Sequence, residues 1–334
     1  MTVLCNVCTK GRYDTTLPLT LMAIAMQTMP PHKLVIFDDN DDPKDMREVQ
    51  TYQYLFEILQ LKNIPWEWVY AQKKGQHFSH QTAQRMAVDQ GHTWVWRVDD
   101  DAVPEPNVLE NLYNCTGANY AAKFGHPIGA VGGAVLTPPF SDTKNVTGKI
   151  EMISSEPNLQ WNYIEGGKSV DHLHCTFLYR AGVMDYNLEL SRVAHREETL
   201  FTYGLKQKGY TVLAVPFANT WHMKNREGGI RTGAQEMFQH DEQIFRNILG
   251  IGDQTIVVLD SGMGDHIVFK HVLPKIKNPL IFSCYPEIIP GRSIQEAKDL
   301  YGDLGRYNIY QQMDAWKWKG SLQSAFEKLY GVDK

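Results

Sequence analysis

The sequence predicts an α/β fold in which helices cover both faces of a sheet. Two observations support this prediction. Strand-like and helix-like segments alternate along the first part of the chain, as in α/β proteins. Several of the strand-like segments are apolar throughout, such as TVLCNVCT at residues 2–9, and such strands are buried on both faces of a sheet.

The alternation is regular up to residue 99. The helical segment at 17–29 stops at Pro30 and Pro31, because proline cannot continue a helix. The segments that follow keep the same order, with strands expected at 33–38, 66–71 and 93–99 and helices at 45–62 and 79–90.

The pattern changes between about residues 103 and 190. Gly and Pro are frequent there, as in GAVGGAVLTPPF, so we expect short strands and long loops over a site. Beyond it the sequence predicts a helix at 196–208, a strand at 211–216, a loop at 219–233 and an amphipathic helix at 234–249.

The C-terminal part reads as a fresh α/β unit. Strands are expected at 255–260 and 279–285, and helices at 266–276, near 293–301 and near 320–330. This βαβα order predicts a small Rossmann-like unit. We therefore expect three segments: a domain at 1–233, a connecting helix and linker at 234–253, and the small domain at 254–334.

Composition excludes some classes of function. The 334-residue chain has a formal net charge of −5 and no long Lys/Arg run, which disfavours a nonspecific nucleic-acid coat or a polybasic membrane anchor. The sequence contains no run of 18 apolar residues, so no membrane span is predicted. The N-terminus lacks the features of a secretory signal. Five scattered cysteines favour a reducing compartment, so we expect a cytoplasmic location. Cys5 and Cys8, although spaced C-x-x-C, are expected to be core residues.

Polar clusters follow three of the predicted strands. They are Thr9–Arg12, Asp38-Asp39-Asn40 and Asp99-Asp100-Asp101. Ligands of open α/β sheets bind at the carboxyl ends of the strands, so these clusters are candidate ligand contacts. If residues 99–101 are extended, Asp99 and Asp101 point the same way and offer hard oxygen ligands to a divalent cation. A solvated acidic turn before Pro104 is the alternative.

A second acidic motif lies further along the chain. Glu197 and Glu198 open a predicted helix, and His222 follows the next strand. Acidic residues in a first helical turn can simply complement the helix dipole, and a lone histidine can be a satisfied polar residue. The order of these pieces, however, is that of a known family.

Residues 1–225 resemble a family 2 glycosyltransferase with the GT-A fold, a Rossmann-like mixed α/β sheet. The matching pieces are CTKGR after the first strand, QTMPPHKLVIFDDN at the second, VDDDAVPEPNVL as the D-x-D motif, and EET…KGYTVLAVPFANTWH. The resemblance implies a metal-dependent, inverting transfer of a hexosyl or pentosyl group from a nucleoside-diphosphate sugar, with UDP favoured, to an acceptor hydroxyl.

The resemblance also implies roles for single residues. Thr9 and Asp39 would hold the nucleobase, and Asp99 would contact the ribose or the metal. Asp101 and His222 would bind the metal, for which Mn²⁺ suits a carboxylate–imidazole set better than Mg²⁺. Glu198 would be the catalytic base, with Glu197 beside it. The remaining nucleotide-contact candidates at these positions are Arg12, Asp38, Asp100 and Arg85.

The sequence departs from the family pattern in several places. Glu-Glu replaces the usual Glu-Asp, which leaves the identity of the base open. The Arg-Asn usually found upstream of the D-x-D motif is not obvious, and Gln84-Arg85 lies near its place. The Q-x-x-R-W motif of processive synthases is absent, so transfer of one or a few sugars is expected. A catalytically weak or inactive GT-A scaffold that binds glycans or nucleotides is the alternative function; a nucleotidyltransferase is disfavoured, because TKGRYD matches its Gly-rich signature poorly.

Acceptor-side features are less specific. Lys224, Arg226 and Arg231 flank two glycines in a loop that could close over a diphosphate, or be a mobile basic loop. Trp161, Tyr163, His172 and His174 are candidates for an acceptor pocket or for core packing. A glycan is the favoured acceptor; protein, lipid-linked sugar and modified nucleic acid, the last through a groove at Lys73, Lys74 and Arg85, stay open.

The C-terminal unit carries one further motif. Gly262, Gly264 and Asp265 form a G-x-G-D turn that resembles the opening of a heptosyltransferase-type GT-B domain. The second half of such an enzyme is missing after it. We therefore expect residues 254–334 to dock an acceptor or another subunit.

Overall fold

The computed structural model describes residues 2–136, 146–153, 156–162, 166–224, 228–229 and 235–249, together with three strands at 255–259, 279–283 and 308–311. The chain divides into two units, one of residues 1–151 with 158–245 and one of residues 152–157 with 246–334. Among the described residues, no helix has both the length and the apolar character that crossing a membrane requires.

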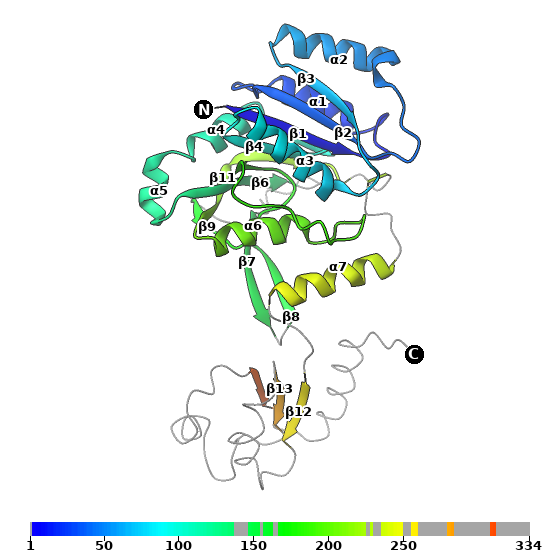
Figure 1. Cartoon of the computed structure of the whole chain (residues 1–334). Helices are drawn as coiled ribbons and strands as arrows, with labels where there is room; N and C mark the ends of the chain where they lie inside the picture. Colours follow the sequence, from blue (N-terminus) through cyan, green and yellow to red (C-terminus); the bar gives the residue numbers. More distant parts are fainter. Residues whose placement is uncertain are drawn as a thin grey trace. The chain divides into compact units, whose positions relative to one another are not determined.

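The first unit is built on a nine-stranded mixed sheet with strand order β3-β2-β1-β4-β10-β6-β11-β5, and β9 pairs with β11 (Figure 1). Strands β1 to β4 are parallel to one another, β10 is antiparallel to both of its neighbours, and β6 is parallel to β11. The strands span Val3–Thr9 (β1), Lys33–Asp38 (β2), Trp66–Tyr70 (β3), Trp94–Asp99 (β4), Ala102–Pro104 (β5), Ile128–Leu136 (β6), Lys168–Ser169 (β9), Phe177–Arg180 (β10) and Thr211–His222 (β11).

Helices cover both faces of this sheet, as the sequence predicted. The helices are Leu17–Ala25 (α1), Gln50–Leu61 (α2), Gln76–Asp89 (α3), Val108–Asn114 (α4), Ala118–Phe124 (α5), Glu197–Gln207 (α6) and Gln235–Ile248 (α7), with a 3₁₀ turn η1 at Met46–Glu48. On one face, Val3 and Val7 of β1 pack in a core with α1, α2 and α4. On the other face, Leu4 packs in a core with α3 and α6. Alternate residues of one strand therefore serve opposite cores.

The region after residue 103 is more regular than expected. It contains helices α4 and α5 and the nine-residue strand β6, where the sequence had predicted short strands and long loops. The prediction took the frequent glycines of this region as a sign of loops. At Gly133 of β6, an added Cβ would lie 1.9 Å from the Ala218 carbonyl oxygen, so here glycine serves close strand packing rather than a turn. Strand β11 also runs to His222, beyond its predicted end at residue 216.

The remaining strands form small sheets of their own. Strands β7 (Val146–Ile153) and β8 (Glu156–Asn162) make a two-stranded sheet. In the second unit, β12 (Thr255–Leu259), β13 (Pro279–Ser283) and β14 (Asn308–Gln311) pair in parallel, which agrees with the first two predicted strands and adds a third. The three helices predicted after residue 254 and the turn at Gly262, Gly264 and Asp265 lie outside the described residues.

Candidate active site

The polar clusters that follow the predicted strands lie at one edge of the sheet. Strands β1, β2 and β4 are parallel neighbours that end at Thr9, Asp38 and Asp99. Thr9 is in register with Asp38, and Cys8 is in register with Asp99. This edge is therefore the carboxyl edge at which open α/β sheets bind ligands.

The aspartate triplet is a turn, not an extended segment. Strand β4 ends at Asp99, residues 100 and 101 form a turn, and β5 begins at Ala102. The chain turns because it changes neighbours: β4 lies between β1 and β10, whereas β5 pairs with β11. The expectation that Asp99 and Asp101 align by strand alternation was wrong. Both carboxylates nevertheless lie near His222.

His222 and Asp101 are brought together by the extended strand β11. His222 is in register with Ala102, directly after Asp101. Its Nε2 lies 3.2 Å from Oδ1 of Asp101, and only 18% of the histidine side chain is exposed. Burial lowers the pKa of His222, but the hydrogen bond and the negative charge of Asp101 outweigh it, so the pKa is raised overall. Both groups can ligate one divalent cation.

A cysteine joins the predicted metal ligands. Sγ of Cys175, a carboxylate oxygen of Asp99 and a ring nitrogen of His222 lie within 4.8 Å of one another. Cys175 is buried, in the loop before β10. No spacing in the sequence indicates this cysteine, because the three residues come from three separate segments that only the sheet brings together.

Arg97 connects the two acidic motifs, and sequence reasoning missed it. Its Nη1 donates to Glu197 Oε1 at 2.6 Å, and its Nη2 donates to Asp99 Oδ1 at 2.9 Å and to Glu198 Oε2 at 3.3 Å. The arginine side chain is fully buried. Burial lowers its pKa, but the surrounding carboxylates raise it further, so the guanidinium stays charged. The signal in the sequence was a cation inside the otherwise apolar strand WVWRV.

The two glutamates differ in environment. Glu197 is fully buried and also accepts a hydrogen bond from Gln76 Nε2 at 2.9 Å, whereas 11% of the Glu198 side chain is exposed. Burial raises the pKa of Glu197 to about 7, with Glu198 adding to the rise and Arg97 opposing it. Glu198 is therefore the glutamate that a ligand can reach.

The backbone that presents these glutamates is strained. Ala194 and Arg196 have φ angles of 52° and 67°, a conformation that costs a non-glycine residue about 1–3 kcal/mol. The buried Asp241 of α7 holds this segment, because it accepts hydrogen bonds from Ser191 N at 2.6 Å and His195 N at 2.7 Å. Strain of this kind persists where surrounding contacts fix it, as they do here.

Arg12 and Asp100 form an ion pair with each other. Arg12 Nη1 donates to Asp100 and lies 3.1 Å from Asp101 Oδ2. Lys10 N also donates to Asp100, at 3.3 Å. Burial raises the pKa of Asp100 to about 6, although the charge of Arg12 opposes the rise. These predicted nucleotide contacts thus lie beside Asp101 and hold the turn.

In the second-strand cluster, Asp38 braces the loop and Asp39 faces Arg192. Asp38 accepts hydrogen bonds from the Tyr13 hydroxyl and from Asn40 Nδ2, the latter at 2.7 Å, so it braces the loop. Asp39 is fully buried, and Nε of Arg192 lies 3.6 Å from its Oδ2. Burial raises the pKa of Asp39, while the charge of Arg192 opposes this. Sequence reasoning did not anticipate Arg192.

Arg85 is not brought to this cluster. It is exposed on α3, whereas the partly buried Gln76 at the start of that helix contacts Glu197. At 1.5 Å per residue, Arg85 lies about 13 Å further along the helix. Within the described residues, Arg85 makes no hydrogen bond or ion pair with the other candidates, so we leave it out of the site.

The predicted basic loop is described only in part. Gly229 N donates to Lys10 O at 2.7 Å, and an added Cβ on Gly228 would lie 2.4 Å from the Gly11 carbonyl oxygen. The glycines of this loop thus pack on the loop after β1. Arg226, Arg231 and Tyr163 lie outside the described residues, as does the side chain of Trp161, while His172 is buried and His174 partly buried.

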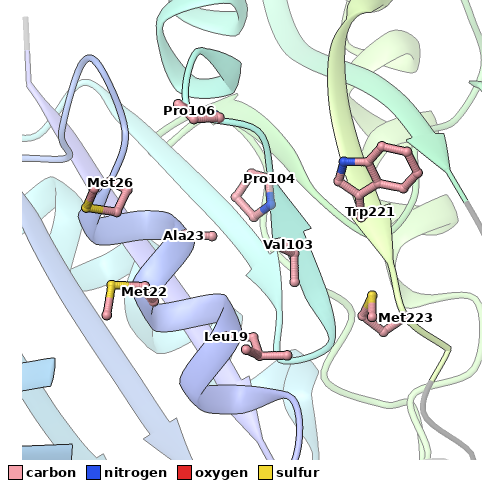
Figure 2. A pocket seen from close by; sticks show the side chains of 9 residues that line it. All are labelled: Leu19, Met22, Ala23, Met26, Val103, Pro104, Pro106, Trp221 and Met223. Atoms are coloured by element: carbon pink, nitrogen blue, oxygen red, sulfur yellow. The ribbon is translucent and has the colours of Figure 1, made fainter.

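An apolar cavity of about 490 Å³ lies between α1 and the paired strands β5 and β11 (Figure 2). Trp221 and Met223, the neighbours of His222, line it together with Val103, Met22 and Met26. Because strand residues alternate sides, this cavity is on the opposite side of β11 from the His222 imidazole. Its lining is almost entirely apolar, so it lacks the chemistry that a nucleoside diphosphate requires.

The fold has counterparts among solved structures. The chain matches GalNAc-T7, solved with UDP, GalNAc and Mn²⁺, with a TM-score of 0.51 and 11% identity over 74% of this chain and 48% of that chain. It also matches TarS of S. aureus (TM-score 0.48, 14% identity, 91% of this chain and 46% of that chain) and TarS residues 1–349 with UDP-GlcNAc (0.49, 15%, 75% and 72%). The chain thus spans about half the length of TarS and GalNAc-T7. No protein-family profile and no curated protein sequence matches it.

The class that the fold defines is the GT-A class of mixed α/β proteins, which confirms the predicted fold class. The first unit contains all of the candidate residues: the aspartate triplet 99–101, the glutamates 197 and 198, and His222. They lie together at the carboxyl edge of its sheet.

Proposed function

We propose that the chain is a metal-dependent, inverting glycosyltransferase that uses a UDP-sugar as donor and a hydroxyl group as acceptor. The observation that carries the proposal is the meeting of His222 with Asp101 at 3.2 Å, while Arg97 ties Asp99 to Glu198. Three motifs far apart in the sequence converge at one carboxyl edge, as a D-x-D-dependent transfer requires. GalNAc-T7 and TarS, which share features of the fold, bind UDP or a UDP-sugar.

The donor nucleotide is assigned to the ends of β1 and β2. Thr9 and Asp39 would hold the nucleobase, with the Asp39 carboxylate accepting an N–H from a uracil edge. The charge of Arg192, whose Nε lies 3.6 Å from Asp39 Oδ2, favours the ionised form of this carboxylate. Arg12 would contribute positive charge toward the diphosphate while remaining paired with Asp100 and Asp101.

The residues present fit a divalent cation. Asp101 and Asp99 offer carboxylate oxygens and His222 offers a nitrogen, a mixed set that suits Mn²⁺ better than Mg²⁺. When bound, such a cation neutralises charge on the leaving diphosphate. The chain's own part is to hold these side chains in place through Arg12 on Asp101 and Arg97 on Asp99.

Glu198 is the proposed base. Its carboxylate is the more exposed of the two glutamates, and it would accept the proton of the acceptor hydroxyl as that oxygen attacks the anomeric carbon. Attack from the side opposite the departing nucleotide inverts the anomeric configuration. Glu197, buried against Arg97, would position the helix end rather than contact the acceptor.

The acceptor is proposed to be a glycan hydroxyl. In this scheme residues 1–233 form the catalytic domain, 234–253 connect it, and 254–334 dock the acceptor or a further subunit. The four described cysteines are free thiols, which supports a reducing, cytoplasmic setting.

Calorimetric titration with UDP and Mn²⁺ tests the proposal. Wild-type protein should bind UDP more tightly with Mn²⁺ than without it, and Asp101→Ala should lose this difference. Arg85→Ala is a matched control, because this exposed residue lies away from the site. Metal-dependent hydrolysis across a panel of nucleotide sugars would then identify the donor. Undiminished binding in Asp101→Ala would count against the assigned site.

One observation favours a second function. Arg97 Nη2 lies 3.3 Å from Oε2 of the proposed base Glu198, so this carboxylate is already engaged in an ion pair inside the protein. The alternative is therefore a weakly active or inactive GT-A scaffold that binds nucleotide or glycan. Tight UDP binding without hydrolysis or transfer for any donor in the panel would support it.

A further inference from the structure

Cys175 lies in the proposed metal site. Its Sγ, an oxygen of Asp99 and a nitrogen of His222 are all within 4.8 Å of one another, which is a spacing that one bound cation can bridge after small side-chain shifts. The three donors are an oxygen, a nitrogen and a sulfur. This combination suits borderline and soft divalent cations.

The backbone directs Cys175 to this place. Strand β10 pairs antiparallel to β4 with Phe177 opposite Arg97, so the same register carried back two residues puts Cys175 opposite Asp99. Thr176 Oγ1 donates to the Arg97 carbonyl at 2.7 Å, which ties the loop to β4. The contacts of the neighbouring strand residues thus fix the position of Cys175 beside β4.

The turn at Cys175 is of a rare kind. Thr176 N donates to His174 O at 2.9 Å, which closes a three-residue turn around Cys175, whose φ is 65°. Glycine would adopt this conformation with less strain than cysteine. The chain nonetheless carries a thiol here, next to two other metal-ligating side chains.

Burial protects this thiol from bulk solvent, since Cys175 is only 1% exposed. A cation that binds the sulfur takes it as the thiolate, and the proton of the thiol leaves to solvent as the metal–sulfur bond forms.

We propose that Cys175 is a side-chain ligand of the metal site and makes the site select thiophilic cations, Zn²⁺ and Cd²⁺, over Mg²⁺. The inference rests on the metal site of the proposed function. Manganese would be held by the oxygen and nitrogen donors of Asp99, Asp101 and His222, whereas zinc or cadmium would also engage the sulfur. Such cations would compete with Mn²⁺ for the same place.

Cobalt titration of the full chain tests the thiol directly, without relying on activity. Wild-type protein should develop a thiolate-to-Co²⁺ charge-transfer band on binding Co²⁺. Cys175→Ser and Cys175→Gly should bind Co²⁺ without the band; the glycine variant suits the positive φ and guards against misfolding. Cys115→Ser is the matched control, because Cys115 is also a buried free thiol but lies at the end of α4 and not beside Asp99 and His222.

Affinities separate this inference from the proposed function. Both Cys175 variants should bind Cd²⁺ at least about tenfold more weakly, as expected for loss of a ligand, while Cys115→Ser should bind Cd²⁺ as wild type does. Cobalt binding without a charge-transfer band, or a band that survives in both Cys175 variants, overturns the role of Cys175 and leaves the proposed function standing. Absence of any Mn²⁺ or Co²⁺ binding to wild-type protein overturns both.

Discussion

Nη1 of Arg97 lies 2.6 Å from Oε1 of Glu197, and both side chains are fully buried. The same guanidinium reaches Asp99 of the D-x-D edge and Glu198 beside it. One cation inside strand β4 therefore links the segment that ends β4 to the start of α6. Because Arg97 is buried among carboxylates, its charge stabilises the fold. It also holds the proposed metal ligand Asp99 and the proposed base Glu198 in fixed positions relative to each other.

Removing this arginine should destabilise the protein strongly. Arg97→Met leaves buried carboxylates without their cation, which costs about 3–5 kcal/mol when one partner of a buried ion pair is lost. Urea unfolding at pH 7 measures the change. Arg85→Met, at an exposed position, should stay within about 0.5 kcal/mol of wild type. A loss below about 1 kcal/mol in Arg97→Met would show that the buried pair contributes little.

The two glutamates should separate kinetically. Glu198→Gln removes the proposed base and should lower turnover about 10²–10⁴-fold, while UDP affinity with Mn²⁺ stays near the wild-type value. Glu197→Gln keeps a hydrogen-bonding group beside Arg97 and should lower turnover less. Transfer assays with the donor found in the nucleotide-sugar panel give both values. Comparable turnover in Glu198→Gln and wild type excludes Glu198 as the base.

Glu242 should make stability depend on acid pH. Its Oε2 lies 3.0 Å from Arg196 Nε and 3.4 Å from His195 Nε2. Burial raises its pKa, but the hydrogen bond from His195 and the charge of Arg196 outweigh it and lower the pKa from 4.5 to about 2. A carboxyl whose pKa is lower when folded stabilises above its unfolded pKa, and that stability is lost as the pH falls from about 5 to about 2.

The measurement compares two proteins at two pH values. Unfolding free energy should fall between pH 7 and pH 3 by less in Glu242→Gln than in wild type, and the difference should be at most about 2 kcal/mol. Glu236→Gln is the matched control on α7, since Glu236 is exposed. An equal pH dependence in wild type and Glu242→Gln would mean that this pair does not lower the pKa.

Gly228 should be required for the contact between its loop and the loop after β1. Gly228→Ala puts a Cβ 2.4 Å from the Gly11 carbonyl oxygen, which is too close for two non-bonded atoms. It also forces a φ of 74° on alanine. Hydrogen–deuterium exchange of the Gly229 amide, which donates to Lys10 O, should speed up. Gly209→Ala shares the positive φ, at 82°, but meets nothing within 4 Å, so it should leave this amide unchanged. Equal protection in both variants would contradict the close contact.

The regular alternation of the first ninety-nine residues made the fold predictable. Strands β1 to β4 and helices α1 to α3 follow local periodicity, because β1, β2 and β4 are buried on both faces, the edge strand β3 is half-buried, and each helix buries one stripe. The prediction of loops around β6 was wrong, because Gly133 permits close strand packing there and does not form a turn. Local patterns do not distinguish these two uses of glycine.

The sequence by itself determined the α/β order and the chemistry of the site: aspartates after β4, a glutamate pair opening α6 and a histidine after them. Only the tertiary structure decided which of these side chains meet. The turn at Asp100 and Asp101, the partnership of Arg97 with both acidic motifs, and the arrival of Cys175 beside Asp99 all depend on strand register. Register is fixed by which buried faces pack together across the whole sheet, and no local segment carries that information.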